Sequence, residues 1–258
     1  MNILTLDALR TLYAPARERS VKKELTHLDA HCLRFVALSP FVVIASSGVA
    51  GALDASPCGG VPGFVKAQGS GTLLIPDSPG NNRLDTLENI IQTGQTGQIG
   101  LLFLVLGLDE SLRVNGRATL STNEANLTVC AEPKRRPKLV IRVTVEEAYR
   151  HCAKALMRLA LWDPARHIDR AALPSMGEML KDQIGGDLPA ETQAEMLVRY
   201  AQDLRTPVRV CYDFYSCFRR FCSGWQPESF FKPSPKVNQR FERYCSSLAS
   251  SFYRANLN

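Results

Sequence analysis

The chain has 258 residues and a hydrophobic fraction of 45%, which is typical of a globular protein with one sizeable domain plus an extension. Its formal net charge is +6, but residues 1–200 carry 22 Lys and Arg against 21 Asp and Glu, whereas residues 201–258 carry 9 against 4. The basic character therefore belongs to the tail, and it gives no support to nucleic-acid binding by the main domain.

Targeting and metal signals are absent from the sequence. No apolar run reaches the roughly 18 residues that a membrane-spanning helix needs, and the N-terminus lacks the basic-then-apolar order of a signal peptide. We therefore expect a cytoplasmic protein that spans no membrane. The eight cysteines form no CxxC pair, and His27 and His31, one helical turn apart, have no third ligand nearby. The sequence predicts reduced thiols and no metal site.

The predicted elements are short strands with helices on either side. Leucine spacing indicates a short helix over 4–13 and a longer one over 20–38. A branched apolar run over 40–47 indicates a buried strand, and we expect a hairpin after it, with a loop around Ser56-Pro57. Further strands are predicted over 64–67, 72–75, 99–105, 111–120 and 138–145. Further helices are predicted over 82–91, 145–161, 175–183 and 189–204.

About six strands joined by short turns and flanked by helices predict a mainly β domain of the α+β class, built on a small closed or partly closed barrel. An Asn115-Gly116 pair inside the strand at 111–120 predicts a β-bulge there. We expect four parts: an N-terminal helical segment at 1–24, the barrel at 25–170, helices at 171–205, and a tail at 206–258. The tail holds 12 of the 20 aromatic residues, and we interpret it as an accessory extension or a reading-frame artefact.

The stretch from Thr72 to Ile91, TLLIPDSPGNNRLDTLENII, predicts a strand, a loop and a helix. Asn81 is the expected N-cap of this helix, and Asn82 and Arg83 would stand in its first turn. Free backbone donors, the helix dipole and a guanidinium would then converge and favour an anion. The alternative is an ordinary connection with solvated polar residues, because the stretch has neither Walker nor GxGxxG spacing.

Five segments, taken in order, carry a family resemblance: SPFVVIASS, SPCGGVPGFV, TLLIPDSPGNNRLDTLENI, GLLFLVLGLDESLRVNGRA and VTVEEAYRHCAKALMRLALWDP. Together they resemble the pyridoxamine 5′-phosphate oxidase-related FMN-binding proteins, most closely a bacterial subfamily described as probable FMN-dependent enzymes. The match runs from about Leu25 to Asp163. It implies a six-stranded FMN-binding split barrel that dimerises and holds FMN in a cleft at the subunit interface.

The resemblance also implies which residues bind the cofactor. The FMN phosphate would be met by the polar and basic groups that precede the helix, the flavin would lie along backbone at the end of the strand, and the SP segment would add a weaker contact. These residues are Asn81, Asn82, Arg83, Ile75, Pro76 and Ser56.

The chain departs from the subfamily pattern at one of these segments. The subfamily usually has SPRGD where this chain has Ser56-Pro57-Cys58-Gly59-Gly60, so that an arginine and an aspartate are missing. If that arginine contacts the cofactor or the substrate, Cys58 cannot replace it. The Arg and Lys arrangement of authentic pyridoxamine phosphate oxidases is not evident either, and we do not expect a vitamin B6 enzyme.

Four further residues are candidates around the flavin. Arg117 would steady anionic reduced flavin or a neighbouring acidic group, or is an exposed strand charge. His151 and Lys154 lie three apart on the helix expected over 145–161, so they would share a face on the substrate side, or simply a solvated face. Trp162 would cap the flavin pocket or close the core. No catalytic residue is assigned, since the sequence has no GxSxG, HExxH or convincing triad.

The sequence thus predicts an FMN-dependent oxidoreductase that acts with a small-molecule substrate and an electron donor or acceptor, because FMN carries out redox chemistry through its own ring. The substrate, and the choice between FMN and F420, remain open. The main alternative is a non-enzymatic flavin- or haem-binding protein on the same barrel. A third class is an interaction protein that uses its aromatic tail.

Overall fold

The computed structural model describes residues 2–94, 97–133, 135–186 and 189–205. Within these ranges no helix has the length and apolar character required to cross a lipid bilayer. The tail at 206–258 lies outside the described residues, and the four-part division of the chain stays a prediction.

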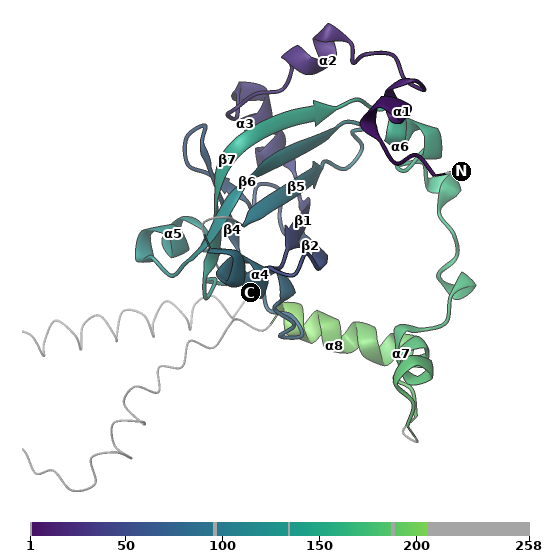
Figure 1. Ribbon diagram of the computed structural model, residues 1–258. Helices are drawn as coiled ribbons and strands as arrows, with labels where there is room; N and C mark the ends of the chain where they lie inside the picture. Colours follow the sequence, from purple (N-terminus) through teal and green to yellow (C-terminus); the bar gives the residue numbers. More distant parts are fainter. Residues whose placement is uncertain (1, 95–96, 134, 187–188, 206–258) are drawn as a thin grey trace, which may run out of the picture. The chain divides into compact units, whose positions relative to one another are not determined.

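Seven strands form one antiparallel sheet in the order β2-β1-β5-β6-β7-β4-β3 (Figure 1). Their bounds are β1 Phe41–Ser47, β2 Leu53–Gly59, β3 Lys66–Ala67, β4 Thr72–Pro76, β5 Gln98–Leu104, β6 Ser111–Ser121 and β7 Val140–His151. The two edge strands, β2 and β3, are not hydrogen-bonded to each other in this sheet order. The sheet is therefore a barrel that stays split along one seam, and the expected α+β split-barrel fold is confirmed.

Eight α-helices belong to the described residues: α1 Leu6–Arg10, α2 Glu18–Lys22, α3 Ala30–Leu38, α4 Asp85–Thr93, α5 Glu124–Val129, α6 Lys154–Leu159, α7 Met176–Ile184 and α8 Gln193–Arg205. The single helix expected over 20–38 is wrong, because the structure has two helices there. The backbone N–H of Cys32 donates to Asp29 Oδ1 at 2.7 Å, so Asp29 caps a new helix and separates α3 from α2.

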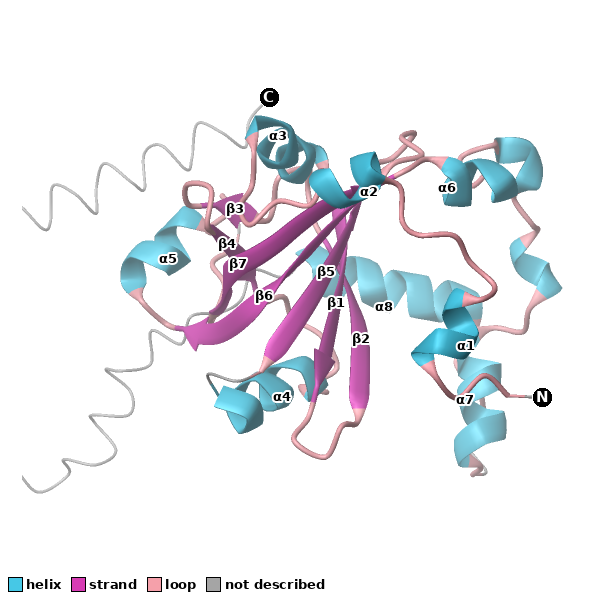
Figure 2. Cartoon of the chain, turned by 45° about the horizontal axis from the view of Figure 1, so that its top comes forward, coloured by secondary structure: helices cyan, strands magenta, loops and turns pink. Residues whose placement is uncertain are grey.

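The core lies on the concave face of the sheet and is closed by helices at its two ends. Figure 2 shows α3 at one end of the strands and α4 at the other. The α3 residues Cys32, Phe35 and Val36 pack in the same cluster as strand residues such as Phe103 and Leu112. At the opposite end, Asn89 of α4 donates to Ser46 Oγ at 3.0 Å. The barrel is thereby filled with side chains rather than left as a pore.

The strand count differs from the expected six because β2 replaces the loop expected around Ser56-Pro57. In the structure Ser56 pairs with Ile44 and Pro57 with Val43 of β1. Proline lacks the N–H that a central strand needs, which favoured the loop interpretation. An edge strand needs hydrogen bonds on only one side, so β2 accommodates this proline.

The helix expected over 145–161 is also wrong in its first half. β7 continues to His151, and only Lys154–Leu159 is helical. The helix-favouring letters of EEAYRH are overridden because β7 pairs with β6 over its whole length, from Ser111↔His151 to Ser121↔Val140. The predicted bulge between Asn115 and Gly116 is confirmed as a register shift in this pairing.

Candidate functional site

The loop between β4 and α4, residues 77–84, is the site that the sequence predicts for an anion. Asn81 is not the N-cap of the following helix. Its Oδ1 accepts from the Arg83 N–H at 3.0 Å, and Asn82 has a left-handed φ of 60°. These two features hold the chain outside helical geometry until α4 begins at Asp85, with Leu84 at the N-cap position. The expectation that Asn82 and Arg83 occupy the first helical turn is therefore wrong.

Arg83 forms an ion pair with a neighbouring carboxylate. Its Nε pairs with Asp85 Oδ2 at 2.5 Å, and the Arg83 side chain is 76% exposed. The hydrogen bond and charge of Asp85 raise the pKa of Arg83. The guanidinium is thus accessible to a ligand, but an anion would compete with a carboxylate for it.

Ser56 lies on β2 in a small hydrogen-bonded group with Asp54 and Thr86. The Ser56 hydroxyl lies 3.0 and 3.2 Å from the two carboxylate oxygens of Asp54, to which it donates. Thr86, in the first turn of α4, donates to Asp54 as well. Because its one proton is committed to Asp54, Ser56 can offer a cofactor only oxygen lone pairs.

Ile75 and Pro76 end β4, and both are buried. They pair with Ile141 and Val140 of β7 on one side. On the other side β3 pairs with β4 only up to Leu74, so in the described part of the chain no strand covers this edge of β4 at Ile75 and Pro76. The open edge leaves the backbone of Ile75 and Pro76 free of a second strand, as the expected backbone contact with the flavin requires.

The loop is also contacted by an arginine that lies outside the strand–loop–helix segment. Arg135, from the basic run at 134–136, donates from Nη2 to Ser78 Oγ at 3.0 Å. Beside it, burial raises the pKa of Asp77, although Lys138 and Arg135 act in the opposite direction. The basic run itself was visible in the sequence, but its place against this loop was not.

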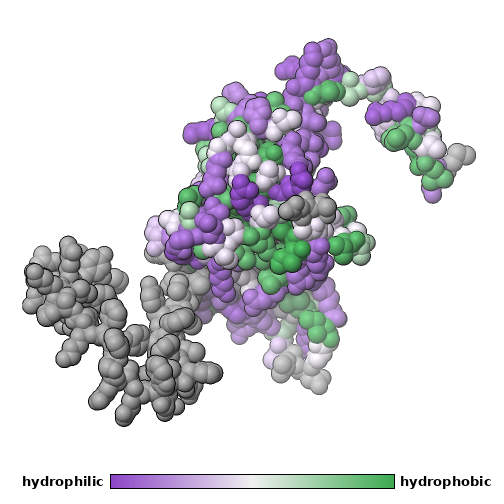
Figure 3. Space-filling view, turned by 60° about the vertical axis from the view of Figure 1, so that its left-hand side comes forward, coloured by the Kyte–Doolittle hydropathy of each residue, from purple (hydrophilic) through white to green (hydrophobic). Residues whose placement is uncertain are grey.

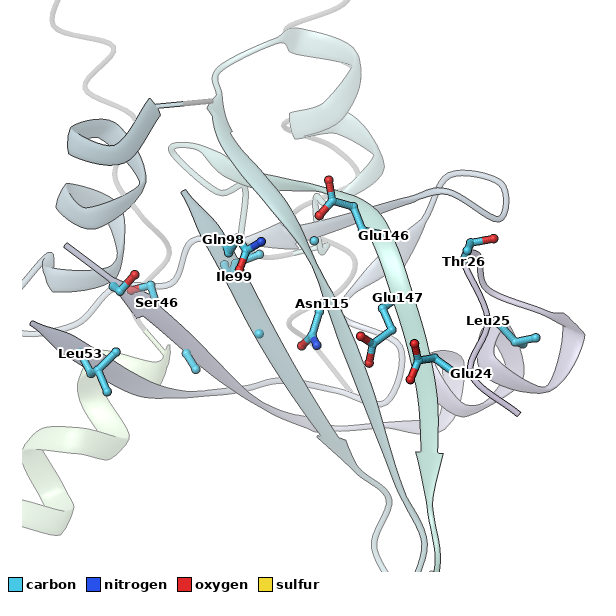
Figure 4. Close-up of a pocket in the computed structure, with 14 residues that line it drawn as sticks. Glu24, Leu25, Thr26, Ser46, Leu53, Gln98, Ile99, Asn115, Glu146 and Glu147 are labelled. Carbon is cyan, nitrogen blue, oxygen red and sulfur yellow. The ribbon is translucent and has the colours of Figure 1, made fainter. Parts of the chain in front are cut away.

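A cavity of about 520 Å³ lies on the face of the sheet opposite the core, which we call the open face (Figure 4). It crosses the sheet from β2 to β7, and its lining includes Ser46, Leu53, Gln98, Asn115, Glu146 and Glu147. Figure 4 shows the side chains of Asn115 and Glu147 close together on adjacent strands. Neither the six residues expected to contact the FMN phosphate and ring nor Arg117 lines this cavity.

Two of the acidic residues that line this cavity form ion pairs with arginines on β6. Glu147 pairs with Arg113, and Glu146 pairs with Arg117 at 2.6 Å. Arg117 therefore belongs to the rim of the open-face cavity through its ion pair. Of the roles considered for Arg117 in the sequence analysis, the ion pair with Glu146 corresponds to contact with a neighbouring acidic group.

The substrate-side candidates do not share a helix face. His151 is the last residue of β7, and Lys154 is the first residue of α6, so that expectation is wrong. The His151 ring packs edge-to-face on Tyr149 at 5.0 Å between centroids, and Lys23 Nζ lies 4.3 Å from the Tyr149 ring centre. Burial first, and then the charges of Arg113 and Lys23, lower the pKa of His151.

Trp162 follows α6 and is half-buried. Its Nε1 donates to the carbonyl oxygen of Leu108 at 2.9 Å, in the turn between β5 and β6. The residue does not belong to the buried core cluster, and it does not line the open-face cavity. In the structure Trp162 connects the segment after α6 to the β5–β6 turn.

Metal and disulfide chemistry find no support in the described ranges. No group of three or more His, Cys, Asp or Glu residues there could hold a metal ion. The four cysteines of the barrel, Cys32, Cys58, Cys130 and Cys152, are free thiols. Burial raises the pKa of Cys32 and of Cys130 to about 11, so these two thiols stay protonated at neutral pH.

These features together define a split-barrel protein with a polar loop at one end of the sheet and a charged cavity on its open face. Residues 28–152 match the family model described as pyridoxamine 5′-phosphate oxidase, and this segment of the chain belongs to that family. Among curated proteins, none matches the chain.

Several solved structures align with about half of this chain at low sequence identity. HupZ of Group A Streptococcus is 17% identical, covering 47% of this chain and 92% of its own, with a TM-score of 0.39. A candidate pyridoxamine 5′-phosphate oxidase of Lactobacillus delbrueckii is 17% identical, with 49% and 98% coverage and a TM-score of 0.39. An FAD-binding protein of Mycobacterium smegmatis is 17% identical, with 49% and 98% coverage and a TM-score of 0.34.

Proposed function

We propose that this protein is an FMN-dependent oxidoreductase whose β4–α4 loop binds the cofactor phosphate. The observation that carries the proposal is the position of this loop inside the matched segment 28–152, with an exposed guanidinium on Arg83 and the exposed amides of Asn81 and Asn82 beside it. Guanidinium and amide N–H groups are the donors that a phosphate dianion prefers. The donors present therefore fit an FMN phosphate.

When bound, FMN would supply hydride and electron transfer through its ring, so the chain needs no nucleophile of its own. The tasks left to the protein are binding, orientation and exclusion of water. The open backbone edge of β4 at Ile75 and Pro76 is a suitable place for the ring, because its peptide groups have no strand partner on that side in the described residues.

The proposal includes a homodimer formed over the open face. Along β2, β1 and β5 this face presents apolar or small side chains to solvent, among them Leu53, 87% exposed, Leu102, 37% exposed, and Ala45 and Ala55. Figure 3 shows hydrophobic surface gathered into patches between hydrophilic regions on one side of the molecule. A second copy of the chain would cover the apolar part of the open face and enclose the cavity.

A substrate would then enter at the open-face cavity. His151 remains a candidate for its far end, because its ring lies on the same face of β7 as Glu147, in register with Ser111 and Asn115 of β6. Lys154 and Trp162 remain weaker candidates, because, like His151, they do not line the cavity in a single copy, and they also lie beyond the end of β7. The cytoplasmic location stays a prediction.

The first experiment is to purify the full chain, record its absorption spectrum, and weigh the extracted ligand by mass spectrometry. We expect bands of oxidised flavin and the mass of FMN; a deazaflavin mass would replace FMN by F420, and a Soret band would support the haem alternative. Reduced nicotinamide cofactor and a dye then test turnover. Bound FMN that never exchanges electrons would leave a flavin carrier rather than an enzyme.

The second experiment measures FMN affinity after Arg83→Ala. Since Arg83 also pairs with Asp85, we expect a loss of about 1.5 kcal/mol, the lower end for a hydrogen bond to a charged group. Gel filtration or light scattering of the flavin-loaded protein tests the dimer. Unchanged FMN affinity would remove Arg83 from the site, and a monomer at micromolar concentration would remove the interface.

A further inference from the structure

Arg135 and Arg136, the described residues of the basic run at 134–136, lie between α5 and β7. The backbone N–H of Glu132 donates to the Arg135 carbonyl at 2.8 Å, and the N–H of Arg135 donates back to the Glu132 carbonyl at 3.1 Å. These two bonds fix the backbone at Arg135. The side chain of this arginine is therefore held in one region rather than sampling the whole surface.

The two described arginines of the run have different partners. Arg136 pairs with Glu124 at the start of α5. Arg135 reaches the β4–α4 loop, where its Nη2 donates to Ser78 Oγ at 3.0 Å. Among the described residues, no carboxylate lies within ion-pair distance of Arg135. Its guanidinium thus keeps its full positive charge at this loop.

Arg83 lies in the loop and Arg135 contacts the loop from another part of the chain, but only Arg83 has a carboxylate partner in the described part of the chain. Arg83 is offset by Asp85, whereas the Arg135 contact is a neutral hydroxyl. Asp77, the first residue of the loop, has its pKa raised by burial, against the opposing effect of the Arg135 charge. A phosphate at the loop would gain more from an uncompensated guanidinium than from one that already has a carboxylate partner.

We infer that Arg135 is the principal cationic contact of the cofactor phosphate, with the Ser78 hydroxyl beside it and Arg83 on the other side of the loop. The inference rests on the proposed function, because it assigns a residue to the FMN site. The main positive charge at the phosphate would then come from Arg135, more than fifty residues further along the chain than Arg83, and not from the strand–loop–helix segment.

The test compares FMN with riboflavin, which has the same ring and no phosphate. Affinities for both are measured by flavin fluorescence titration of the cofactor-stripped full chain, in the wild type, Arg135→Ala and Arg136→Ala. We expect Arg135→Ala to weaken FMN about tenfold or more and to leave riboflavin unchanged. Arg136→Ala removes the same charge from the same turn and should leave both affinities unchanged.

Arg135→Lys keeps the charge without the planar fork, and we expect a loss of FMN affinity intermediate between the wild type and Arg135→Ala. If Arg135→Ala leaves the FMN-to-riboflavin ratio of affinities unchanged, or weakens both ligands equally, the inference is overturned while FMN binding by the wild type still stands. If the wild type binds neither flavin, the proposed function itself fails.

Discussion

The β4–α4 loop and the open face are both polar, but their charges are held in different ways. On the open face the ion pairs Arg113–Glu147 and Arg117–Glu146 join residues about thirty positions apart, which the register of β6 and β7 brings together. In the loop, Arg83 pairs with Asp85 and Asn81 accepts from Arg83, so most contacts lie within two residues. The open face is therefore a product of the sheet, whereas the loop is largely local.

The strongest test of this difference is the bulge that sets the open-face register. A Cβ on Gly116 would lie 2.0 Å from the carbonyl oxygen of Thr144, which is backbone of the adjacent strand. Gly116→Ala should therefore lower the free energy of unfolding by about 3 kcal/mol, the cost of a strained overpacked site. Urea unfolding measures this loss.

Gly100→Ala is the matched control, because Gly100 lines the same cavity but its Cβ would make ordinary contacts, 3.4 Å from Asn115 Oδ1 and 3.7 Å from the Cβ of Ala45. We expect a change within about 0.5 kcal/mol. Equal losses in the two variants would show that the register at Gly116 is not what holds the open face.

The ion pairs offer a second comparison of the two regions. The Arg113–Glu147 pair is 38% and 27% exposed, and the Arg113 Nε is buried without a hydrogen-bond partner in the described structure. Glu147→Gln should cost about 1 kcal/mol of unfolding free energy, the upper end for a partly exposed pair. Asp85→Asn removes the corresponding carboxylate of the loop, where the pair is 76% and 42% exposed, and should cost about 0.3 kcal/mol or less.

Chemical denaturation of both variants at low salt gives the answer. A loop variant that loses as much stability as Glu147→Gln would contradict the contrast between a local loop and a sheet-built face.

The sequence predicted six of the seven strands, all but β2, and only part of the site. The short apolar run from Ile99 to Val105 has the length and the composition of a strand, although in the structure only alternate residues of β5 are buried. The length of β7 was missed, since its pairing with β6 outweighs the helix propensity of its last residues. The position of Arg135 against Ser78 was also missed, because no local pattern encodes a contact across 57 positions.

The carboxylate beside the proposed phosphate gives a third prediction. Asp77 is partly buried at the loop, and its charge would repel a phosphate dianion. Asp77→Asn should strengthen FMN binding roughly threefold and leave riboflavin unchanged, since a 1.4 kcal/mol difference corresponds to tenfold and a screened repulsion is smaller. Asp109→Asn, which removes a charge from the β5–β6 turn, serves as the control. Weaker FMN binding in Asp77→Asn would contradict an anion at this loop.

The smallest effect concerns His151 on the open face. Its pKa is lowered by burial and by the charges of Arg113 and Lys23. Because the unfolded chain binds this proton more readily, stability falls as the pH drops through the ordinary histidine value near 6.5 toward the lowered folded value. Lys23→Met should raise the pKa of His151 and reduce that loss.

NMR titration of the imidazole measures the change directly. Lys22→Met is the control, since Lys22 pairs with Glu18 on α2 rather than facing Tyr149. A His151 pKa that does not move in Lys23→Met would exclude Lys23 from this cluster in solution.

The most direct measurement is the affinity of the cofactor-stripped wild type for FMN and for riboflavin, determined side by side. A loop that binds a phosphate predicts FMN binding tighter than riboflavin binding by about tenfold or more, with the wavelength shift of a bound flavin. Equal affinities would place any flavin without a phosphate contact at residues 77–84, and a chain that binds neither flavin would contradict the account as a whole.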